Sequence, residues 1–159
     1  MAPIEGSSLR QAVQFAITTE QIGAEAYRRF ARKLGDQPEV AQVFAQLAED
    51  EERHEAEFRA IMESVPDHDA VPGYAEKYGY LKAMSISEFF SPRAGLTRDA
   101  EDITTREDAL FRGIELEKAS IAYYQALREV LGASEALDAI LAAERQHLLK
   151  LAGMLDQAD

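Results

Sequence analysis

A short pattern, Glu-x-x-His, occurs twice in this chain and constrains what it can fold into. The two copies are Glu51 to His54 and Glu144 to His147, and they contain two of the three histidines in the sequence. Each copy lies in a long segment with helical periodicity, where residues three apart project from the same helix face. One helix can therefore offer a carboxylate and an imidazole to the same metal site, and we expect long helices that meet around such a site.

Four segments carry apolar residues at helical intervals. They cover about residues 9–34, 38–64, 105–131 and 134–156. Thr104 with Glu107 has the spacing of a capping box, which marks a helix start. Gly35 and Gly132 follow two of the segments and mark helix ends. No stretch alternates polar and apolar residues as a strand does, so the sequence predicts an all-α fold.

The lengths of the connections predict the topology. Only a few residues around Gly35 and around Gly132 separate the paired segments, so each pair should form an antiparallel hairpin. About forty residues, 65–104, lie between the hairpins and are interpreted as a crossover along the bundle. With 159 residues and 47% hydrophobic composition, the whole chain, 1–159, is expected to form one four-helix domain.

Four glutamates should lie at one depth in this bundle. Glu20 lies about fourteen residues before the first bend and Glu51 about thirteen after it, so both should be about 20 Å from that bend. Glu117 and Glu144 are about 15–20 Å from the second bend by the same reasoning. The four carboxylates and the two imidazoles can therefore share one layer.

The two hairpins also resemble each other in sequence. Glu20 precedes Tyr27 by seven residues, as Glu117 precedes Tyr124, and a Glu-x-x-His follows on the next helix in both cases. The tyrosines suit either a plain core position or a role beside the carboxylates. Gly23 and Ser120, three residues beyond Glu20 and Glu117, would leave space for a ligand the size of dioxygen or would serve close helix packing.

The energetics of burial favour a bound cation. Glu20, Glu117 and Glu144 interrupt apolar stripes, and an uncompensated carboxylate in a core costs several kcal/mol. Two divalent cations would balance four carboxylates, and no Lys or Arg occupies a matching core position. The remaining acidic residues around the first Glu-x-x-His are interpreted as solvated surface: Glu49, Asp50, Glu52, Glu55 and Glu57.

Composition excludes several classes of function. The chain has no cysteine, which excludes disulfides, thiolate zinc sites, iron–sulfur clusters and a rubredoxin-type module within it. A net charge of −12 argues against binding to nucleic acid or an anionic membrane. The first residues lack the features of a signal peptide and no segment is apolar enough to span a bilayer, so we expect a soluble, cytoplasmic protein.

Four segments together resemble the helical signatures of the rubrerythrin branch of the ferritin-like superfamily. They are residues 20–27, 51–54, 117–124 and 144–147, and the two hairpins that carry them cover about two-thirds of the chain. The resemblance implies a ferritin-like antiparallel four-helix bundle with a long crossover between the second and third helices. It also implies a cofactor of two iron ions, with manganese as the alternative metal.

The resemblance assigns a role to each residue that it matches. Glu51 and Glu144 would bridge the two metals, and Glu20 and Glu117 would be terminal ligands. Each metal would have one histidine, His54 or His147, and Tyr27 and Tyr124 would contact the carboxylates.

The implied function is redox chemistry with H2O2 or O2, either peroxide reduction or ferroxidase activity, in oxidative stress or iron handling. The family's peroxidases carry a further glutamate where this chain has Ser120, and many carry a rubredoxin domain; this chain would need a separate electron-donor protein. The resemblance also suggests a homodimer. The alternatives are an iron-storage protein without turnover, a di-manganese enzyme, and a metal-free helical interaction module.

Overall fold

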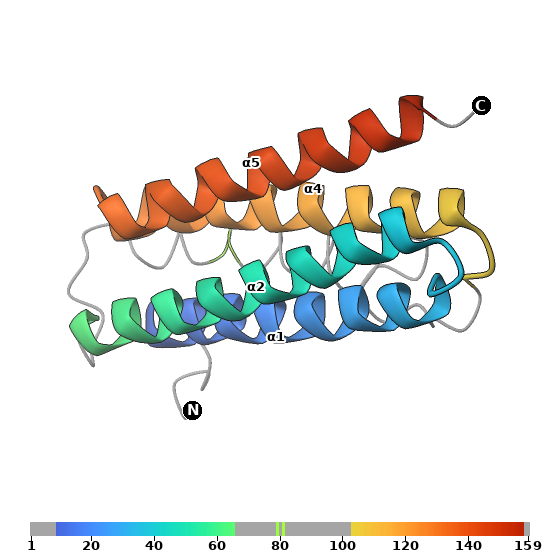
Figure 1. Cartoon of the computed structure of the whole chain (residues 1–159). Coiled ribbons are helices and arrows are strands. Elements are labelled where there is room, and N and C mark those ends of the chain that lie inside the picture. The colour runs from blue at the N-terminus through green and yellow to red at the C-terminus, as the bar shows by residue number, and fades with distance from the viewer. Residues whose placement is uncertain (1–8, 66–78, 80, 82–102, 158–159) are drawn as a thin grey trace.

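The computed structural model describes residues 9–65, 79, 81 and 103–157 of the chain. Four long helices make up this part: α1 (Leu9–Lys33), α2 (Pro38–Ser64), α4 (Arg106–Leu131) and α5 (Glu135–Asp156). They run side by side as an elongated bundle (Figure 1), and no strand occurs among the described residues. The predicted all-α, four-helix fold is therefore confirmed. The predicted crossover, 65–104, lies almost wholly outside the described residues.

The ends of the helices follow local chemistry. Ser134 Oγ accepts a hydrogen bond from the backbone N–H of Leu137 at 3.2 Å and caps α5. The cap of α4 is Thr105, whose Oγ1 accepts from the N–H of Asp108 at 3.1 Å. The capping pair predicted at Thr104 was therefore one residue too early, because two threonines in succession offer the same side chain and the backbone selects the second.

The core is divided into two apolar clusters by a polar layer. One cluster joins the N-terminal half of α1 to the ends of α2 and α4 near Phe58 and Leu127. The other surrounds Phe30 and Phe44, at the opposite end of the bundle. Between the two clusters lie buried carboxylates and imidazoles. This layer is thus held in a low-dielectric interior by apolar packing above and below it.

None of the helices in the described part of the chain is long and apolar enough to cross a membrane.

Two glycines should respond in opposite ways to replacement by alanine. Gly132 has φ 82° and ψ −160°, a conformation that is almost restricted to glycine, so Gly132→Ala is expected to lower the free energy of unfolding by about 1–3 kcal/mol. Gly153 lies inside α5, and an added Cβ would meet no atom of the described residues within 4 Å. Gly153→Ala should therefore raise the free energy of unfolding by about 0.5–1 kcal/mol. Urea denaturation of both variants measures the difference, and equal effects would contradict this account.

Candidate metal centre

The six side chains predicted as metal ligands come together in the polar layer. α1 and α4 contribute one glutamate each, and α2 and α5 contribute the two Glu-x-x-His pairs. All six residues are at most 6% exposed, so each has left solvent on folding. They are Glu20, Glu51, His54, Glu117, Glu144 and His147.

The six residues form two groups that share two members. Glu20 and His54 form one group with Glu51 and Glu144, and the ligand atoms of this group all lie within 4.8 Å of one another. A second group satisfies the same limit, and it consists of Glu51, Glu117, Glu144 and His147. Each group could hold one ion, and the two shared glutamates could bridge a pair of ions.

The shared glutamates direct one oxygen to each imidazole. Nδ1 of His54 lies 2.8 Å from Oε1 of Glu144 and 3.6 Å from Oε2 of Glu51. Nδ1 of His147 lies 3.6 Å from Oε2 of Glu144 and 3.7 Å from Oε1 of Glu51. The two imidazole rings are nearly parallel, 23° apart, with centroids separated by 5.7 Å. The layer is therefore close to two-fold symmetric, as the internal repeat in the sequence suggests.

Several candidate ligand atoms in this layer have no hydrogen-bond partner within the described part of the chain. They include Oε2 of Glu20, Glu117 and Glu144, and Nδ1 of His147. Buried polar atoms are normally paired, so four unpaired ones facing one layer need a further group to satisfy them. Imidazole nitrogens with carboxylate oxygens suit divalent iron, manganese or zinc. The residues present thus fit a pair of divalent cations.

Two buried tyrosines hold the glutamates that the groups do not share. Tyr27 OH donates to Oε1 of Glu117, and Tyr124 OH donates to Oε1 of Glu20, each at 2.6 Å. Burial, followed by the charge of the partner glutamate, raises the pKa of each tyrosine well above its ordinary value, so both hydroxyls remain donors. Both tyrosines are core residues and hydrogen-bond partners at once.

Three carboxylates in the layer have shifted pKa values, those of Glu20, Glu117 and Glu144. Burial raises the pKa of Glu20 well above its ordinary value, and the negative charges of Glu51 and Glu144 act in the same direction. Burial, with the charge of Glu144, raises the pKa of Glu117 to about 8. Burial alone would also raise the pKa of Glu144, but hydrogen bonds from neighbouring groups outweigh it and hold this pKa below the ordinary value.

Both histidines have raised pKa values. Burial on its own would lower the pKa of His54, but the hydrogen bond with Glu144 and the nearby carboxylate of Glu51 raise it to about 10. Burial would also lower the pKa of His147, but the carboxylates close to its ring, chiefly Glu117 and Glu144, raise it. At neutral pH the metal-free layer therefore holds protons that bound cations would displace.

Asp50 was predicted to be solvated surface, and the structure contradicts this. Its side chain is 16% exposed, and Oδ2 lies 3.0 Å from Nε2 of His147, whereas the glutamates of the layer face Nδ1 of the same ring. Partial burial would raise the pKa of Asp50, but hydrogen bonds from Arg53 and His147 lower it. The sequence did contain a signal for this contact. Asp50 lies three residues after Leu47 and four before His54, so it shares a helix face with two residues that are buried.

Of the other acidic residues interpreted as surface, Glu49, Glu52 and Glu57 are exposed and Glu55 is half-buried. Gly23 lies beside Glu51: a Cβ added there would meet Cγ and Cδ of Glu51 at 3.7 Å, an ordinary contact distance. Close helix packing therefore does not require a glycine at this position. Gly23 leaves space for about one methyl group beside Glu51, which both groups share.

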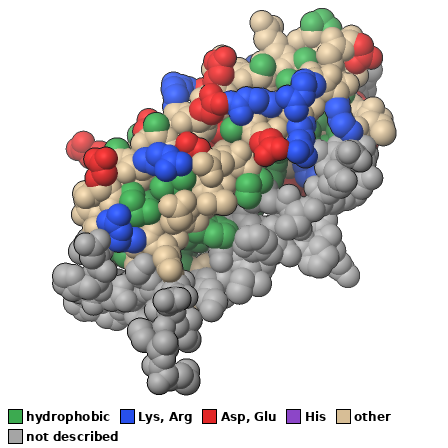
Figure 2. All heavy atoms as spheres, turned by 90° about the horizontal axis from the view of Figure 1, so that it is seen from below, with side chains coloured by type: hydrophobic (Ala, Val, Ile, Leu, Met, Phe, Trp, Pro, Cys, Tyr) green, Lys and Arg blue, Asp and Glu red, His purple; other side chains and the backbone are tan. Residues whose placement is uncertain are grey.

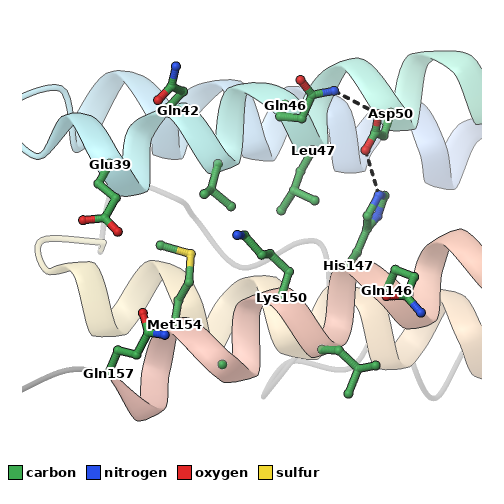
Figure 3. Close-up of a pocket in the computed structure, with 13 residues that line it drawn as sticks. Glu39, Gln42, Gln46, Leu47, Asp50, Gln146, His147, Lys150, Met154 and Gln157 are labelled. Atoms are coloured by element: carbon green, nitrogen blue, oxygen red, sulfur yellow. Dashed lines mark hydrogen bonds and ion pairs between the residues drawn. The ribbon is translucent and has the colours of Figure 1, made fainter.

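A groove between α2 and α5 leads to the layer (Figure 3). It measures about 870 Å³, and Asp50 and His147 lie at its inner end, with Leu47 and Lys150 along it. Figure 2, which views the bundle from below, shows acidic, basic and hydrophobic side chains mixed over that face and no histidine among the described residues. The α2–α5 side is therefore a route by which solvent approaches an imidazole of the layer.

Replacing Tyr124 by Phe separates its packing role from its role beside Glu20. We expect Tyr124→Phe to lower the affinity for divalent metal by about tenfold, because a partner of a ligand carboxylate is lost. Tyr123→Phe is the matched control, since Tyr123 is also buried and its hydroxyl donates to the backbone oxygen of Ala12, outside the layer. Metal titration by calorimetry compares the two, and equal losses of affinity would contradict the expectation.

Comparison with known proteins agrees with this geometry. Searches of curated proteins and of solved structures returned no match. The family model described as Rubrerythrin matches residues 11–155, which include all six residues of the layer. The chain therefore belongs to the Rubrerythrin family, and its buried layer of carboxylates and imidazoles is a group of residues that could bind metal.

Proposed function

We propose that the six residues hold two iron ions, with manganese as the alternative metal. Glu51 and Glu144 bridge the ions, Glu20 and Glu117 are terminal ligands, and each ion has one histidine. The supporting observation is that both groups of possible ligands contain Glu51 and Glu144, and that these two glutamates turn one oxygen toward each imidazole.

We further propose that the protein reduces H2O2, with ferroxidase activity on O2 as the next candidate, in oxidative stress or iron handling. A pair of irons, when bound, supplies a two-electron change to an oxidant. The protein's own groups prepare the site: Tyr27 and Tyr124 fix two carboxylates by hydrogen bonds, and the apolar clusters on both sides keep bulk water away. With no cysteine in the chain, electrons would come from a separate donor protein, and the family resemblance favours a homodimer.

Elemental analysis is the first test of this proposal. Protein expressed with iron and manganese both supplied is expected to retain two ions per chain, mainly iron. Retention of manganese alone would identify a di-manganese protein, and retention of iron well above two per chain would favour storage. Protein that retains neither metal and binds neither in titration would contradict the proposed site.

The second test concerns turnover. Metal-free protein is loaded anaerobically with Fe(II), and H2O2 or O2 is added with a reductant while ferric absorption and oxidant consumption are followed. Repeated consumption of H2O2 in preference to O2 is expected. A slow, single, stoichiometric oxidation would contradict peroxide reduction as the function, whereas faster turnover with O2 would favour ferroxidase activity.

A further inference from the structure

The internal repeat is broken at the residue before each shared glutamate. Asp50 precedes Glu51 on α2, whereas Ala143 precedes Glu144 on α5. Both positions are half-buried, so they occupy comparable places beside the layer. One half of a nearly symmetric site therefore has a carboxylate at a position where the other half has a methyl group.

The two imidazoles differ accordingly on their outer sides. Nε2 of His147 faces Oδ2 of Asp50 at 3.0 Å, while its Nδ1 faces Glu117 at 3.3 Å. His54 also turns Nδ1 to the ligand carboxylates, closest to Glu144. Within residues 9–65 and 103–157, however, no carboxylate is hydrogen-bonded to Nε2 of His54. Only His147 is thus held from both sides by acidic groups in the described structure.

Asp50 is itself held in place. Its Oδ1 accepts a hydrogen bond from Nε2 of Gln46 at 3.2 Å and pairs with the guanidinium of Arg53, which leaves Oδ2 for His147. Figure 3 shows the line of contacts from Gln46 through Asp50 to His147 at the inner end of the groove. Because the carboxylate is fixed on its outer side, it can fix the ring orientation of His147.

We propose, building on the proposed function, that Asp50 is a positioning residue that makes the two metal positions unequal, so that the position at His147 fills first. A carboxylate that accepts the Nε2–H proton selects the tautomer with a free lone pair on Nδ1. It also makes that nitrogen a stronger ligand and removes the ring's freedom to rotate. Among the described residues, His54 has no carboxylate partner at Nε2, so the metal ion that it binds would itself have to order the ring.

Zinc is a suitable probe because it accepts the same ligands and has no redox chemistry. Calorimetric titration of metal-free protein with Zn(II) is expected to show two binding steps that differ at least tenfold in affinity. Asp50→Asn should weaken the tighter step by about 10–100-fold and leave the weaker one unchanged. Glu49→Gln is the matched control, since it removes the same charge from the neighbouring, exposed residue and should change neither step.

Nitrogen-15 NMR of the histidine rings assigns the steps, because the chain contains only three histidines. At one Zn(II) per chain, Nδ1 of His147 should shift while that of His54 does not, and Asp50→Asn should remove this order. Arg53→Gln changes a side chain that is 70% exposed and should weaken the same step to a smaller extent, which keeps the test decisive if Asp50→Asn does not fold.

If the two metal positions of the wild-type protein fill together or in the reverse order, the proposed role of Asp50 is wrong. It is also wrong if the affinity of the first binding step is unchanged in Asp50→Asn. If Asp50→Asn does not fold, an unchanged first step in Arg53→Gln has the same meaning. In those cases the two-metal site would remain. If Zn(II) shifted neither His54 nor His147, the proposed metal site itself would be wrong, so the two failures are distinguishable.

Discussion

Anaerobic addition of Fe(II) to the metal-free protein is expected to raise its melting temperature by about 10 °C. An ion that binds only the folded chain, at a free concentration about 1,000 times its Kd, stabilises it by about 4 kcal/mol. In a domain of this size each kcal/mol corresponds to about 2–4 °C. The physical cause is the layer of buried carboxylate and imidazole atoms that have no hydrogen-bond partner among residues 9–65 and 103–157 and that a bound cation would pair. Differential scanning calorimetry with and without a chelator measures the shift.

A pair of variants on α2 tests whether this gain comes from the proposed site. Glu51→Gln removes the charge of a glutamate common to both groups, so the gain on adding Fe(II) should fall to a few °C or less. Glu57→Gln makes the same chemical change at an exposed position of the same helix and should keep the full gain. Equal gains in the two variants would place the bound metal elsewhere. No gain in the wild-type protein would favour a metal-free helical module.

Much of this site could be predicted because its information is local and repeated. The Glu-x-x-His spacing puts two ligands on one helix face, and the equal distances from the two bends bring all four helices to one level. The helices themselves follow from apolar periodicity, and the all-α fold is confirmed. These features depend on helix geometry, which is nearly the same in every protein.

The contacts between helices were harder to predict. Tyr27 lies seven residues, about 10 Å along the axis, from Glu20 on its own helix, so its partner had to come from another helix. The packing of α1 against α4 selects Glu117, and that packing has no sequence signature. Asp50 was missed for a similar reason: it lies in a run of charged residues that looks solvated, and only the approach of α5 gives it His147 as a partner.

The metal-free protein is expected to lose stability as the pH rises from about 5 to about 9. Glu117, with a folded-state pKa of about 8, is protonated in the folded chain at pH values where the unfolded chain is already ionised. A raised carboxyl pKa means that stability is highest below the unfolded pKa, near 4.5, and is lost as the pH rises through the folded pKa.

His54 acts in the same direction over an overlapping range. Its folded-state pKa is about 10, so its contribution is complete below the unfolded value of 6.5 and disappears as the pH rises through 10. The pKa of Glu144 is lowered, so this residue adds stability that is lost as the pH falls. It therefore opposes the loss of stability with rising pH only at acidic pH. Together these groups should reduce the free energy of unfolding by a few kcal/mol across the range.

Urea unfolding in the presence of a chelator, repeated at intervals of pH, measures this loss. Glu117→Gln removes one of the titrating groups and should flatten the curve, while Glu115→Gln, an exposed neighbour on α4, should leave it unchanged. Bound cations favour ionised carboxylates and neutral imidazoles, so metal-loaded protein should instead gain stability as the pH rises from about 5 to 7. A metal-free protein whose stability rises over the same interval would mean that the carboxylates are already ionised without metal, and the link between burial and metal binding would be lost.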